Sequence, residues 1–276
     1  MGFLSRLARK WWRRSNERSV ALPYAWISGR DPDAAAELLK TLLPVHQTKP
    51  RVVAPPRRRI LVVAPHCDDE AMGPGGTLVA ARAAGAEISI LVLTRGVGAS
   101  GPVREAESRA VAARLGAEIV FLGLEDGALG LDAAAIDAFA TAVEAARPDV
   151  LMLPFFLDDH EDHRRASALL ALSANRLRVR PEVWAYQVYG GVVGDVIVDI
   201  TAVAEAKRDL IRLYASQAAT RDWVNFSLGL AAWNSRFLPR SDTAFGEVFF
   251  VRPFAEWLAL ATGTPPLPAS DPERSP

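Results

Sequence analysis

The stretch ILVVAPHCDDE, residues 60–70, is the part of the sequence that decides the predicted fold. Its first five residues are apolar, which is typical of a strand buried on both faces of a parallel sheet. Strands and helices then alternate along the chain, with strands expected at 60–64, 88–93, 119–122 and 150–156 and helices at 77–84, 103–115 and 133–146. This alternation predicts right-handed βαβ units. We therefore expect a three-layer α/β/α, Rossmann-like domain with a mainly parallel sheet.

The pattern is less regular beyond residue 180. We expect strands at 183–188, 196–200 and 247–251 and helices at 202–217 and 223–234. These elements extend the same domain, which we place at residues 59–255, and we expect a tail at 256–276.

The first 58 residues differ from this domain and predict an N-terminal extension. A helix is expected at 31–43, because Asp31 and Pro32 suit the first positions of a helix and Pro44 would end it. Residues 49–59 are basic and rich in proline, which predicts a linker.

Residues 1–18 contain six basic residues and one acidic residue, interleaved with large apolar side chains. This pattern favours either a basic amphipathic helix on the anionic inner face of a membrane or a solvated arm. No apolar segment follows that would form a secretory signal, and no stretch of about 20 apolar residues predicts a membrane span. We therefore expect a cytoplasmic protein, with peripheral membrane contact through residues 1–18 as the open alternative.

The composition excludes several classes of protein. The 276 residues are 50% hydrophobic and 23% charged, which favours a folded chain over a disordered one. Lys and Arg total 32, as do Asp and Glu, so the whole chain has no basic field to bind nucleic acid. The single cysteine, Cys67, excludes an intramolecular disulfide and a cysteine-rich zinc site.

Two acidic clusters that contain histidine follow two of the predicted strands. HCDDE (66–70) follows the first strand and DDHEDH (158–163) follows the fourth, so three of the four histidines lie at strand ends. Ligands of open parallel sheets bind at the carboxyl ends of the strands. Imidazole and carboxylate groups without sets of thiolates suit zinc or another divalent metal, and three protein ligands with an open position are typical of a catalytic site.

The two clusters resemble the motifs of the PIG-L/LmbE-like family of zinc-dependent N-acetylglucosaminyl de-N-acetylases. HCDDE resembles the family's H-P-D-D-E motif, and HEDH (160–163) matches its H-x-D-H motif. The resemblance covers roughly residues 59–252. It implies an LmbE-like fold and hydrolysis of the acetamide of an amino-sugar conjugate of the N-acetylglucosamine type. It also implies Zn²⁺, or another divalent metal, as the cofactor.

The same resemblance implies roles for residues of the two motifs. His66, Asp69 and His163 would bind the metal. Asp68 would be the general base that activates the metal-bound water for attack on the acetamide carbonyl.

A second group of residues is implied in the later steps and in substrate binding. His160 would stabilise the tetrahedral intermediate or protonate the leaving amine, oriented by Asp162. Arg104 and Asp126 are candidate substrate contacts, with an ion pair or a charge on a helix surface as the alternatives.

The sequence departs from the family pattern at Cys67, where proline is usual. We expect Cys67 to be a small buried side chain that points away from the metal. Most aromatic side chains beyond residue 180 are expected to pack in the core instead of stacking on a sugar; they include Trp184, Tyr186, Tyr189, Trp223, Phe226 and Trp233.

Two other classes of function stay open at this point. One is a different metal-dependent hydrolase, either a phosphoesterase, for which Arg95 and Arg104 are the best support, or an amidase for non-sugar substrates. A non-catalytic sugar-binding module would be expected to have lost Asp68 or His160. The small-molecule substrate is open among lipid-linked, nucleotide-linked and free amino sugars.

Overall fold

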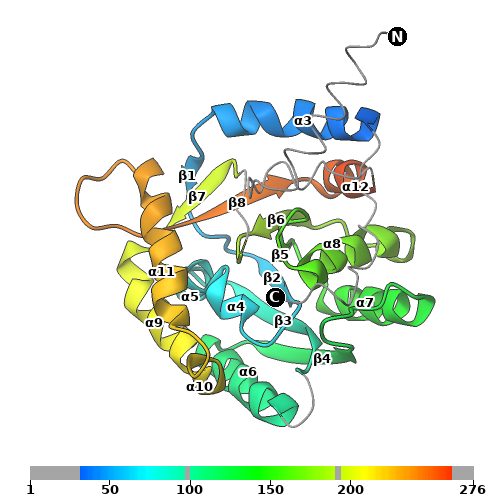
Figure 1. Ribbon diagram of the computed structural model, residues 1–276, viewed down its shortest axis with the longest axis horizontal. Helices are drawn as coiled ribbons and strands as arrows, with labels where there is room; N and C mark the ends of the chain where they lie inside the picture. Colours follow the sequence, from blue (N-terminus) through cyan, green and yellow to red (C-terminus); the bar gives the residue numbers. More distant parts are fainter. Residues whose placement is uncertain (1–31, 97–99, 190–193, 263–276) are drawn as a thin grey trace, which may run out of the picture.

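Figure 1 shows the computed structural model, which describes residues 32–96, 100–189 and 194–262, with side chains from residue 40 onward. Residues 1–18, and with them the predicted membrane contact, lie outside the described part of the chain. The strands are β1 (Arg51–Val53), β2 (Arg59–Ala64), β3 (Glu87–Thr94), β4 (Glu118–Leu124), β5 (Val150–Pro154), β6 (Glu182–Tyr186), β7 (Val196–Asp199) and β8 (Gly246–Arg252). The α-helices are α3 (Pro32–Gln47), α4 (Asp69–Met72), α5 (Gly75–Ala83), α6 (Gly101–Leu115), α7 (Ala133–Ala146), α8 (Glu161–Ser173), α9 (Ala204–Arg212), α10 (Ala215–Ala218), α11 (Trp223–Asn234) and α12 (Phe254–Thr262).

The described strands form one mixed, mostly parallel sheet in the order β1-β7-β8-β6-β5-β2-β3-β4. β2 pairs in parallel with β3 on one side and with β5 on the other. β8 is the exception, because it runs antiparallel to both β6 and β7. The predicted α/β architecture is therefore confirmed.

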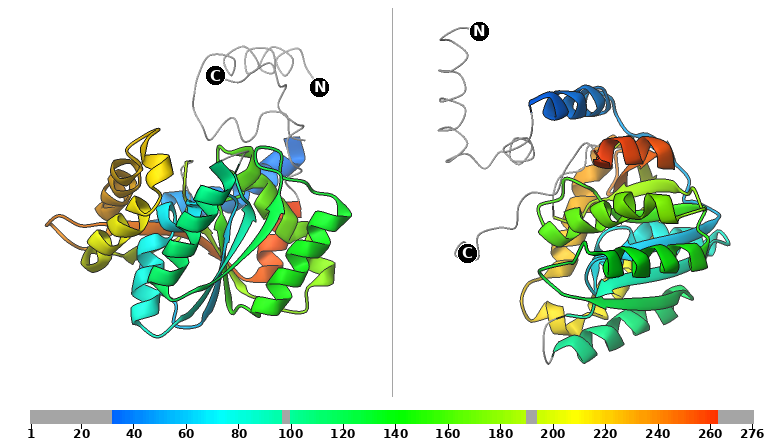
Figure 2. Two further views of the ribbon diagram at one scale, coloured as in Figure 1. Left: turned by 90° about the horizontal axis from the view of Figure 1, so that it is seen from below. Right: turned by 90° about the vertical axis from the view of Figure 1, so that its right-hand side faces the viewer.

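Helices cover both faces of the sheet, which gives the three predicted layers (Figure 2). Alternate residues of β2 enter two separate cores. Ile60, Val62 and Ala64 pack with residues of α5, α6, α9 and α11, whereas Leu61 and Val63 pack with residues of α7, α8 and α12. Burial on both faces explains why β2 is an uninterrupted apolar run.

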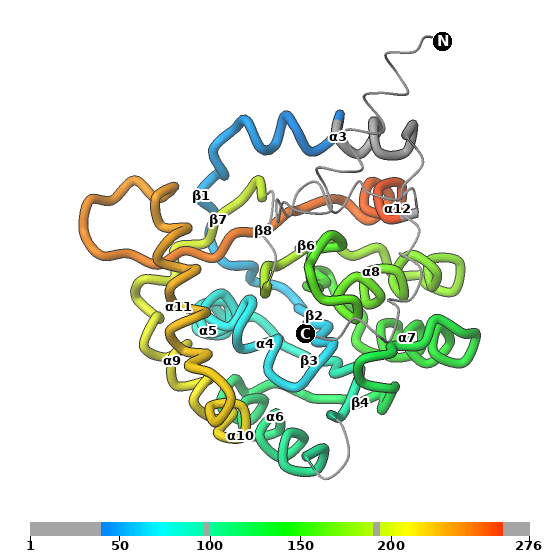
Figure 3. The backbone as a smooth tube through the Cα atoms, viewed as in Figure 1, coloured from blue at the N-terminus to red at the C-terminus, as the bar shows by residue number. Residues whose placement is uncertain are grey.

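The N-terminal side of the sheet differs from the sequence prediction. Residues 51–53, expected to belong to a linker, form β1, which pairs in parallel with β7 although the two are far apart in the sequence (Figure 3). The expected helix also continues past Pro44 to Gln47. Pro44 therefore lies in the last turn of the helix instead of ending it.

The C-terminal side differs as well, because the expected tail begins inside helix α12. Trp257 of this helix has no exposed surface, and its ring meets Phe156 edge-on at a centroid distance of 5.2 Å. The helix expected at 202–217 is divided at Tyr214, whose backbone is not helical and whose buried side chain contacts Glu70 and Ser108. None of the described helices is long and apolar enough to cross a membrane.

The sheet has its topological switch point between β2 and β5. The chain runs from β2 outward to β3 and β4, then returns to β5 on the opposite side of β2. The loops that follow β2 and β5 therefore leave the same edge of the sheet in opposite directions, and a crevice between such loops is where α/β sheets bind ligands. These are the loops that carry the two acidic clusters.

Removing the Trp257 ring tests whether α12 belongs to the core. Trp257→Ala is expected to lower the free energy of unfolding by about 3–5 kcal/mol, because a large buried ring is replaced by a cavity. Urea unfolding followed by circular dichroism measures the change. Glu256→Ala, at an exposed position of the same helix, is the control and should change stability by less than about 0.5 kcal/mol. If Trp257→Ala lowers the free energy of unfolding as little as the control does, the assignment of α12 to the core is contradicted.

Candidate active site

The loops after β2 and β5 bring three histidines together. His66 lies in the first loop, His160 is the N-cap residue of α8, and His163 lies in the first turn of α8. The ring centroids of His66 and His160 are 4.7 Å apart, those of His66 and His163 are 5.4 Å apart, and those of His160 and His163 are 5.0 Å apart. The expectation that residues 97 positions apart meet at one sheet edge holds for this structure.

A buried carboxylate lies between two of these imidazoles. Asp69 Oδ2 is 3.4 Å from His66 Nδ1 and 3.3 Å from His163 Nε2, and it accepts a hydrogen bond of 2.8 Å from the His66 backbone N–H. Asp69 and His163 have no exposed surface. Among the described residues, Asp69 Oδ1 and both ring nitrogens of His163 have no partner with hydrogen-bond geometry. Buried polar atoms without partners are rare, so these atoms indicate a missing ligand, and their chemistry fits a divalent metal.

The second nitrogen of each of these histidines faces another carboxylate. His66 Nε2 is 3.1 Å from Asp162 Oδ2, and His163 Nδ1 is 3.1 Å from Asp158 Oδ1. Metal-binding histidines commonly donate their other N–H to a carboxylate in this way, which fixes the ring and its tautomer. The two histidines are thus held with His66 Nδ1 and His163 Nε2 turned toward Asp69.

In the described part of the chain, two groups of three side chains have ligand atoms that all lie within 4.8 Å of one another. One consists of His66, His160 and His163, and the other of His66, Asp126 and Asp162. The second group is less suited, because Asp162 already accepts hydrogen bonds from the backbone N–H groups of Gly127 and Leu129, at 2.7 and 3.0 Å. Asp69 retains a buried oxygen with no such donor. We therefore favour His66, Asp69 and His163 as the ligand set.

The opposite charges within and around the ligand set shift the pKa values of its side chains. Burial lowers the pKa of His66, but hydrogen bonds to Asp162 and Asp69 outweigh burial and raise this pKa to about 10. Burial likewise opposes the charged form of His163, and the charges of Asp69 and Asp158 raise its pKa to about 9. Burial favours neutral Asp69, yet the two histidines hold its pKa far below the usual value. Metal binding requires neutral imidazoles, so a bound cation takes the place of these protons.

Asp68 has a strained backbone. Its φ of 134° lies in a region that L-residues rarely adopt, and such strain is found at functional sites. The Asp68 N–H donates to Glu70 Oε2 at 3.3 Å, and Arg104 Nη2 lies 3.4 Å from Asp68 Oδ2. Burial and the nearby charge of Asp69 raise the pKa of Asp68 well above its usual value, against the opposing effect of Arg104.

His160 is in a different state from the other two histidines. Its Nδ1 accepts a hydrogen bond of 3.2 Å from the Asp162 backbone N–H, so in the neutral ring Nε2 carries the proton. Burial lowers the pKa of His160, and the neighbouring charges of His66 and His163 lower it further. His160 therefore offers a neutral N–H donor at its Nε2.

The structure corrects one predicted contact and places two further candidates. Asp162 was expected to orient His160, but its carboxylate contacts His66, and only its backbone N–H reaches His160. Asp126 lies 3.5 Å from His66 Nε2 and 3.8 Å from Arg104 Nη1. The Arg104–Asp126 contact is an ion pair within the site. Arg104 Nη2 also donates a hydrogen bond of 2.9 Å to the Cys67 carbonyl.

A hydrogen-bonded network lies beneath this loop. Tyr214 Oη donates to Glu70 Oε1 and lies 3.0 Å from Ser108 Oγ. Burial raises the pKa of Glu70 to about 7. Cys67 is fully buried, as expected, and burial raises the pKa of its thiol to about 12, so this thiol stays protonated at neutral pH.

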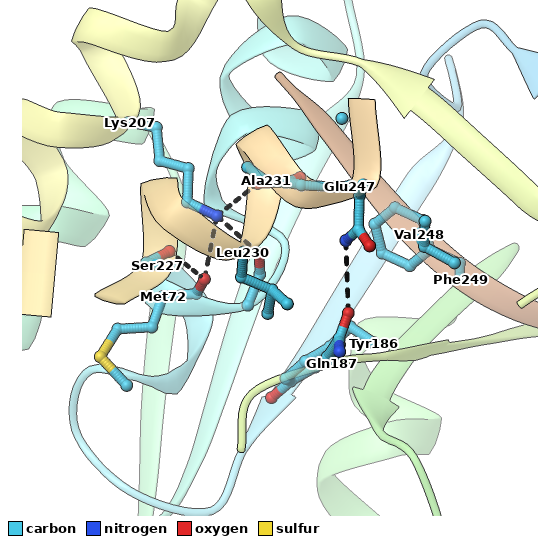
Figure 4. Close-up of a pocket in the computed structure, with 13 residues that line it drawn as sticks. Met72, Tyr186, Gln187, Lys207, Ser227, Leu230, Ala231, Glu247, Val248 and Phe249 are labelled. Carbon is cyan, nitrogen blue, oxygen red and sulfur yellow. Dashed lines mark hydrogen bonds and ion pairs between the residues drawn. The ribbon is translucent and has the colours of Figure 1, made fainter. Parts of the chain in front are cut away.

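A buried ion pair fixes the helices that follow the loop (Figure 4). Lys207 Nζ donates to Glu247 Oε1 at 2.6 Å and to the carbonyls of Met72 and Gly73 at 2.9 Å. Glu247 in turn accepts hydrogen bonds from two N–H groups in the first turn of α5. The pair therefore joins the end of α4 to the start of α5 beside a cavity of about 20 Å³, which is large enough for one water.

The match to a family model coincides with this geometry. Residues 61–174 match the family model described as PIG-L, GlcNAc-PI de-N-acetylase, and this range includes most of β2, all of β5 and both loops. The favoured ligand set and the strained Asp68 lie within the matched range, at the topological switch point of the sheet.

Solved structures of similar fold extend the likeness beyond the residues that match the family model. A conserved protein of Thermus thermophilus is 28% identical, with a TM-score of 0.63 over 70% of this chain and 93% of its own. The N,N′-diacetylchitobiose deacetylase of Pyrococcus horikoshii is 22% identical, with a TM-score of 0.61 over 82% and 95%. The 4-carboxy-2-hydroxymuconate hydratase of Pseudomonas putida is 18% identical, with a TM-score of 0.56 over 71% and 96%. The last two likenesses show a shared fold, on which both a deacetylase and a hydratase are found.

Sequence reasoning missed Asp158 as a site residue. It was noted only as part of an acidic run, but its carboxylate contacts His163 Nδ1 and accepts hydrogen bonds from the backbone N–H groups of His160 and Tyr189. Position could have suggested it, because Asp158 lies five residues before His163 at a strand end. Which of the adjacent acids turns inward could not be read from the sequence.

Asp158→Asn is expected to weaken metal binding by about 10–100-fold, because the carboxylate that orients His163 is lost. Competition with a chromophoric chelator measures the affinity of the metal-free protein for Zn²⁺. Asp159→Asn changes the exposed neighbouring acid and should leave the affinity unchanged. Equal affinities of the two variants would refute the role assigned to Asp158.

The backbone strain at Asp68 predicts an unusual order of stability. Asp68→Gly should be about 1–2 kcal/mol more stable than Asp68→Ala, because glycine relieves the strain at φ 134°. At an unstrained position alanine would be the more stable, because glycine loses more conformational freedom on folding. Thermal unfolding of the two variants gives the sign, and a more stable alanine variant would rule out strain.

Proposed function

We propose that this chain is a metal-dependent N-deacetylase that hydrolyses the acetamide of an amino-sugar conjugate. The observation that carries the proposal is the buried set His66, Asp69 and His163, which adjoins the strained Asp68 and the neutral donor His160. The PIG-L match, whose description refers to a GlcNAc-PI de-N-acetylase, supports the reaction. The fold shared with a diacetylchitobiose deacetylase agrees with an amino-sugar substrate.

The ligand chemistry supports zinc as the physiological metal. Two imidazole nitrogens and one carboxylate are the ligands of many catalytic zinc sites. Held by His66, Asp69 and His163, the ion would supply a Lewis acid that lowers the pKa of water and polarises the acetamide carbonyl.

The protein's own side chains would perform the proton transfer and hold the developing charge. Asp68 would take a proton from the attacking water, and its raised pKa suits a base that must hold that proton. His160 would donate a hydrogen bond from Nε2 to the oxygen that becomes negative in the tetrahedral intermediate. Arg104, which contacts Asp68 and lies near Asp126, would keep the base in place and face the substrate.

A phosphoesterase has less support. Arg104 is engaged with Asp68 and the Cys67 carbonyl, and Arg95 is exposed, 3.8 Å from Glu105 and stacked near Phe121. Two arginines held in this way do not form a clamp for a phosphate group.

The proposal predicts chelator-sensitive release of acetate from an N-acetylated amino sugar. Acetate is measured enzymatically over a panel of free, glycosidic, nucleotide-linked and lipid-linked substrates. Asp68→Asn should lower the rate by about 10²–10⁴-fold, the usual contribution of a general base. His46→Gln removes the one histidine remote from the site and should leave the rate unchanged.

Two results would contradict the deacetylase assignment. One is the absence of chelator-sensitive acetate release from every substrate of the panel. The other is full activity of Asp68→Asn, which would exclude the assigned base.

A further inference from the structure

A wide hollow rich in arginine lies at the edge of the sheet opposite the candidate active site. It opens at the amino-terminal ends of β2, β5 and β6, where backbone hydrogen bonds of 2.9 Å join Arg59 to Asp149 and Asp149 to Glu182. Its volume of about 920 Å³ lies within the roughly 300–1,000 Å³ typical of sites for small molecules. We call it the basic hollow, and it is lined by Arg58, Arg59, Glu144, Arg147, Pro148, Asp149, Arg178, Val179, Arg180, Pro181, Glu182, Pro253, Phe254 and Ala255.

The basic hollow is separate from the residues proposed to bind the metal. The candidate active site lies beyond the carboxyl ends of β2 and β5, whereas the hollow lies at the amino ends of the same strands. The six residues of β2, at about 3.3 Å each, place the two about 20 Å apart. A small molecule in the hollow would therefore not touch the residues of the candidate active site.

The three carboxylates of the basic hollow are engaged within the protein. Asp149 accepts two hydrogen bonds from the Arg59 guanidinium, at 3.0 and 3.1 Å. Glu144 Oε1 accepts hydrogen bonds of 2.6 and 2.9 Å from the backbone N–H groups of residues 178–179. Glu182 Oε2 accepts a hydrogen bond of 2.8 Å from an indole N–H of β6. Only the first of these interactions neutralises an arginine of the hollow.

The arginines of the basic hollow outnumber its carboxylates by five to three. Arg59 is paired with Asp149, and Arg180 Nη1 donates to two backbone carbonyls of its own loop. The exposed guanidinium groups of Arg58, Arg147 and Arg178 make no hydrogen bond or ion pair with any residue of the described part of the chain. An excess of positive charge on a concave surface attracts an anion.

The backbone at Arg147 supports a role for its side chain. Arg147 ends α7 with a φ of 44°, in the left-handed region where glycine is the usual residue. Glycine adopts this conformation without the steric cost that a larger residue incurs. Stability alone would therefore favour glycine at this position, so the arginine is not explained by the fold.

We propose that the basic hollow binds a ligand that carries phosphate groups, through Arg58, Arg147 and Arg178. Arginine suits this chemistry, because its planar guanidinium can donate two parallel hydrogen bonds to phosphate oxygens. Pro148 and Pro181, which line the hollow, restrict the backbone and make part of its wall rigid. The concave form favours a soluble phosphorylated molecule. This inference does not depend on the proposed deacetylation.

Isothermal titration calorimetry with inorganic pyrophosphate tests the basic hollow in the full chain. The native protein should show saturable binding that weakens as salt is added, because exposed charges are screened. Arg147→Gly and Arg178→Gln should each weaken binding by about tenfold, since each variant loses a hydrogen bond to a charged group. Arg114→Gln is the matched control, because it removes an exposed arginine of α6 outside the hollow, and it should bind as the native protein does.

Arg147→Gly also separates ligand binding from stability. Glycine relieves the left-handed backbone at this position, so the variant should unfold at no lower temperature than the native protein while its binding is weakened. A variant that unfolds at a lower temperature and binds pyrophosphate as before would show that the side chain serves the end of α7, and would contradict the proposal. Arg178→Gln carries the comparison if Arg147→Gly does not fold.

Vesicles distinguish a soluble ligand from the headgroup of a phospholipid, which offers the same phosphate group. The native protein and the variants are sedimented with vesicles of phosphatidylcholine and phosphatidic acid in equal parts, and with phosphatidylcholine alone. Binding of pyrophosphate that both hollow variants weaken, without an effect of these variants on sedimentation, supports a soluble ligand. Sedimentation with phosphatidic acid that both variants reduce and Arg114→Gln does not reduce supports a phospholipid headgroup.

The proposal is overturned if the native protein and both hollow variants bind pyrophosphate and vesicles equally, or if none of them binds either. It is also overturned if a chelator abolishes pyrophosphate binding and the hollow variants do not change it, because the probe then binds at the metal site. Failure to release acetate would contradict the proposed function alone, since these measurements involve no turnover.

Discussion

The carboxylate of Asp69, buried between two imidazoles, is the interaction on which the candidate site depends. A buried negative charge is tolerated only where positive charge or hydrogen bonds compensate it. His66 and His163 provide this compensation in the structure, and Asp162 and Asp158 hold the outer nitrogens of both rings. The ligand atoms of these side chains are therefore already oriented toward a cation. The side chains need little reorganisation when a cation binds.

The sheet brings these groups together without long-range flexibility. β2 and β5 are neighbouring parallel strands, so the loops that follow them leave the same edge. The Lys207–Glu247 pair fixes the end of the first loop's short helix, and α8 fixes His163 in the second. Asp68 of the first loop has a strained backbone, and its N–H donates a hydrogen bond to Glu70.

Much of this architecture could be predicted from the sequence because the apolar pattern is strong where strands and helices are regular. The helices at 133–146 and 223–234 have the predicted bounds. β1 was missed because a three-residue strand between prolines has no periodicity of its own, and it exists only through pairing with β7. The predicted helix at 202–217 is interrupted because Tyr214 turns inward to Glu70, a tertiary contact that local propensity does not contain.

In the candidate site, too, the sequence predicted which residues would be involved but not all of their tertiary contacts. The motifs predicted which histidines and acids would gather, and the structure brings them together at one edge. The spacing of the motifs in the sequence could not show that the Asp162 carboxylate would contact His66 instead of His160. It also could not show that Asp158 would contact His163. Both contacts depend on how imidazole rings from two distant loops are oriented. The strain at Asp68 was likewise hidden, since no residue type marks it.

The most direct test of the central claim is the position of the metal in a crystal of the zinc-loaded protein, located by anomalous scattering at the zinc absorption edge. One ion is expected, bonded to His66 Nδ1, to an oxygen of Asp69 and to His163 Nε2, with Asp158 and Asp162 remaining on the outer nitrogens. An ion bound instead by Asp126 and Asp162, or the absence of any ion between the three proposed ligands at saturating zinc, would contradict it.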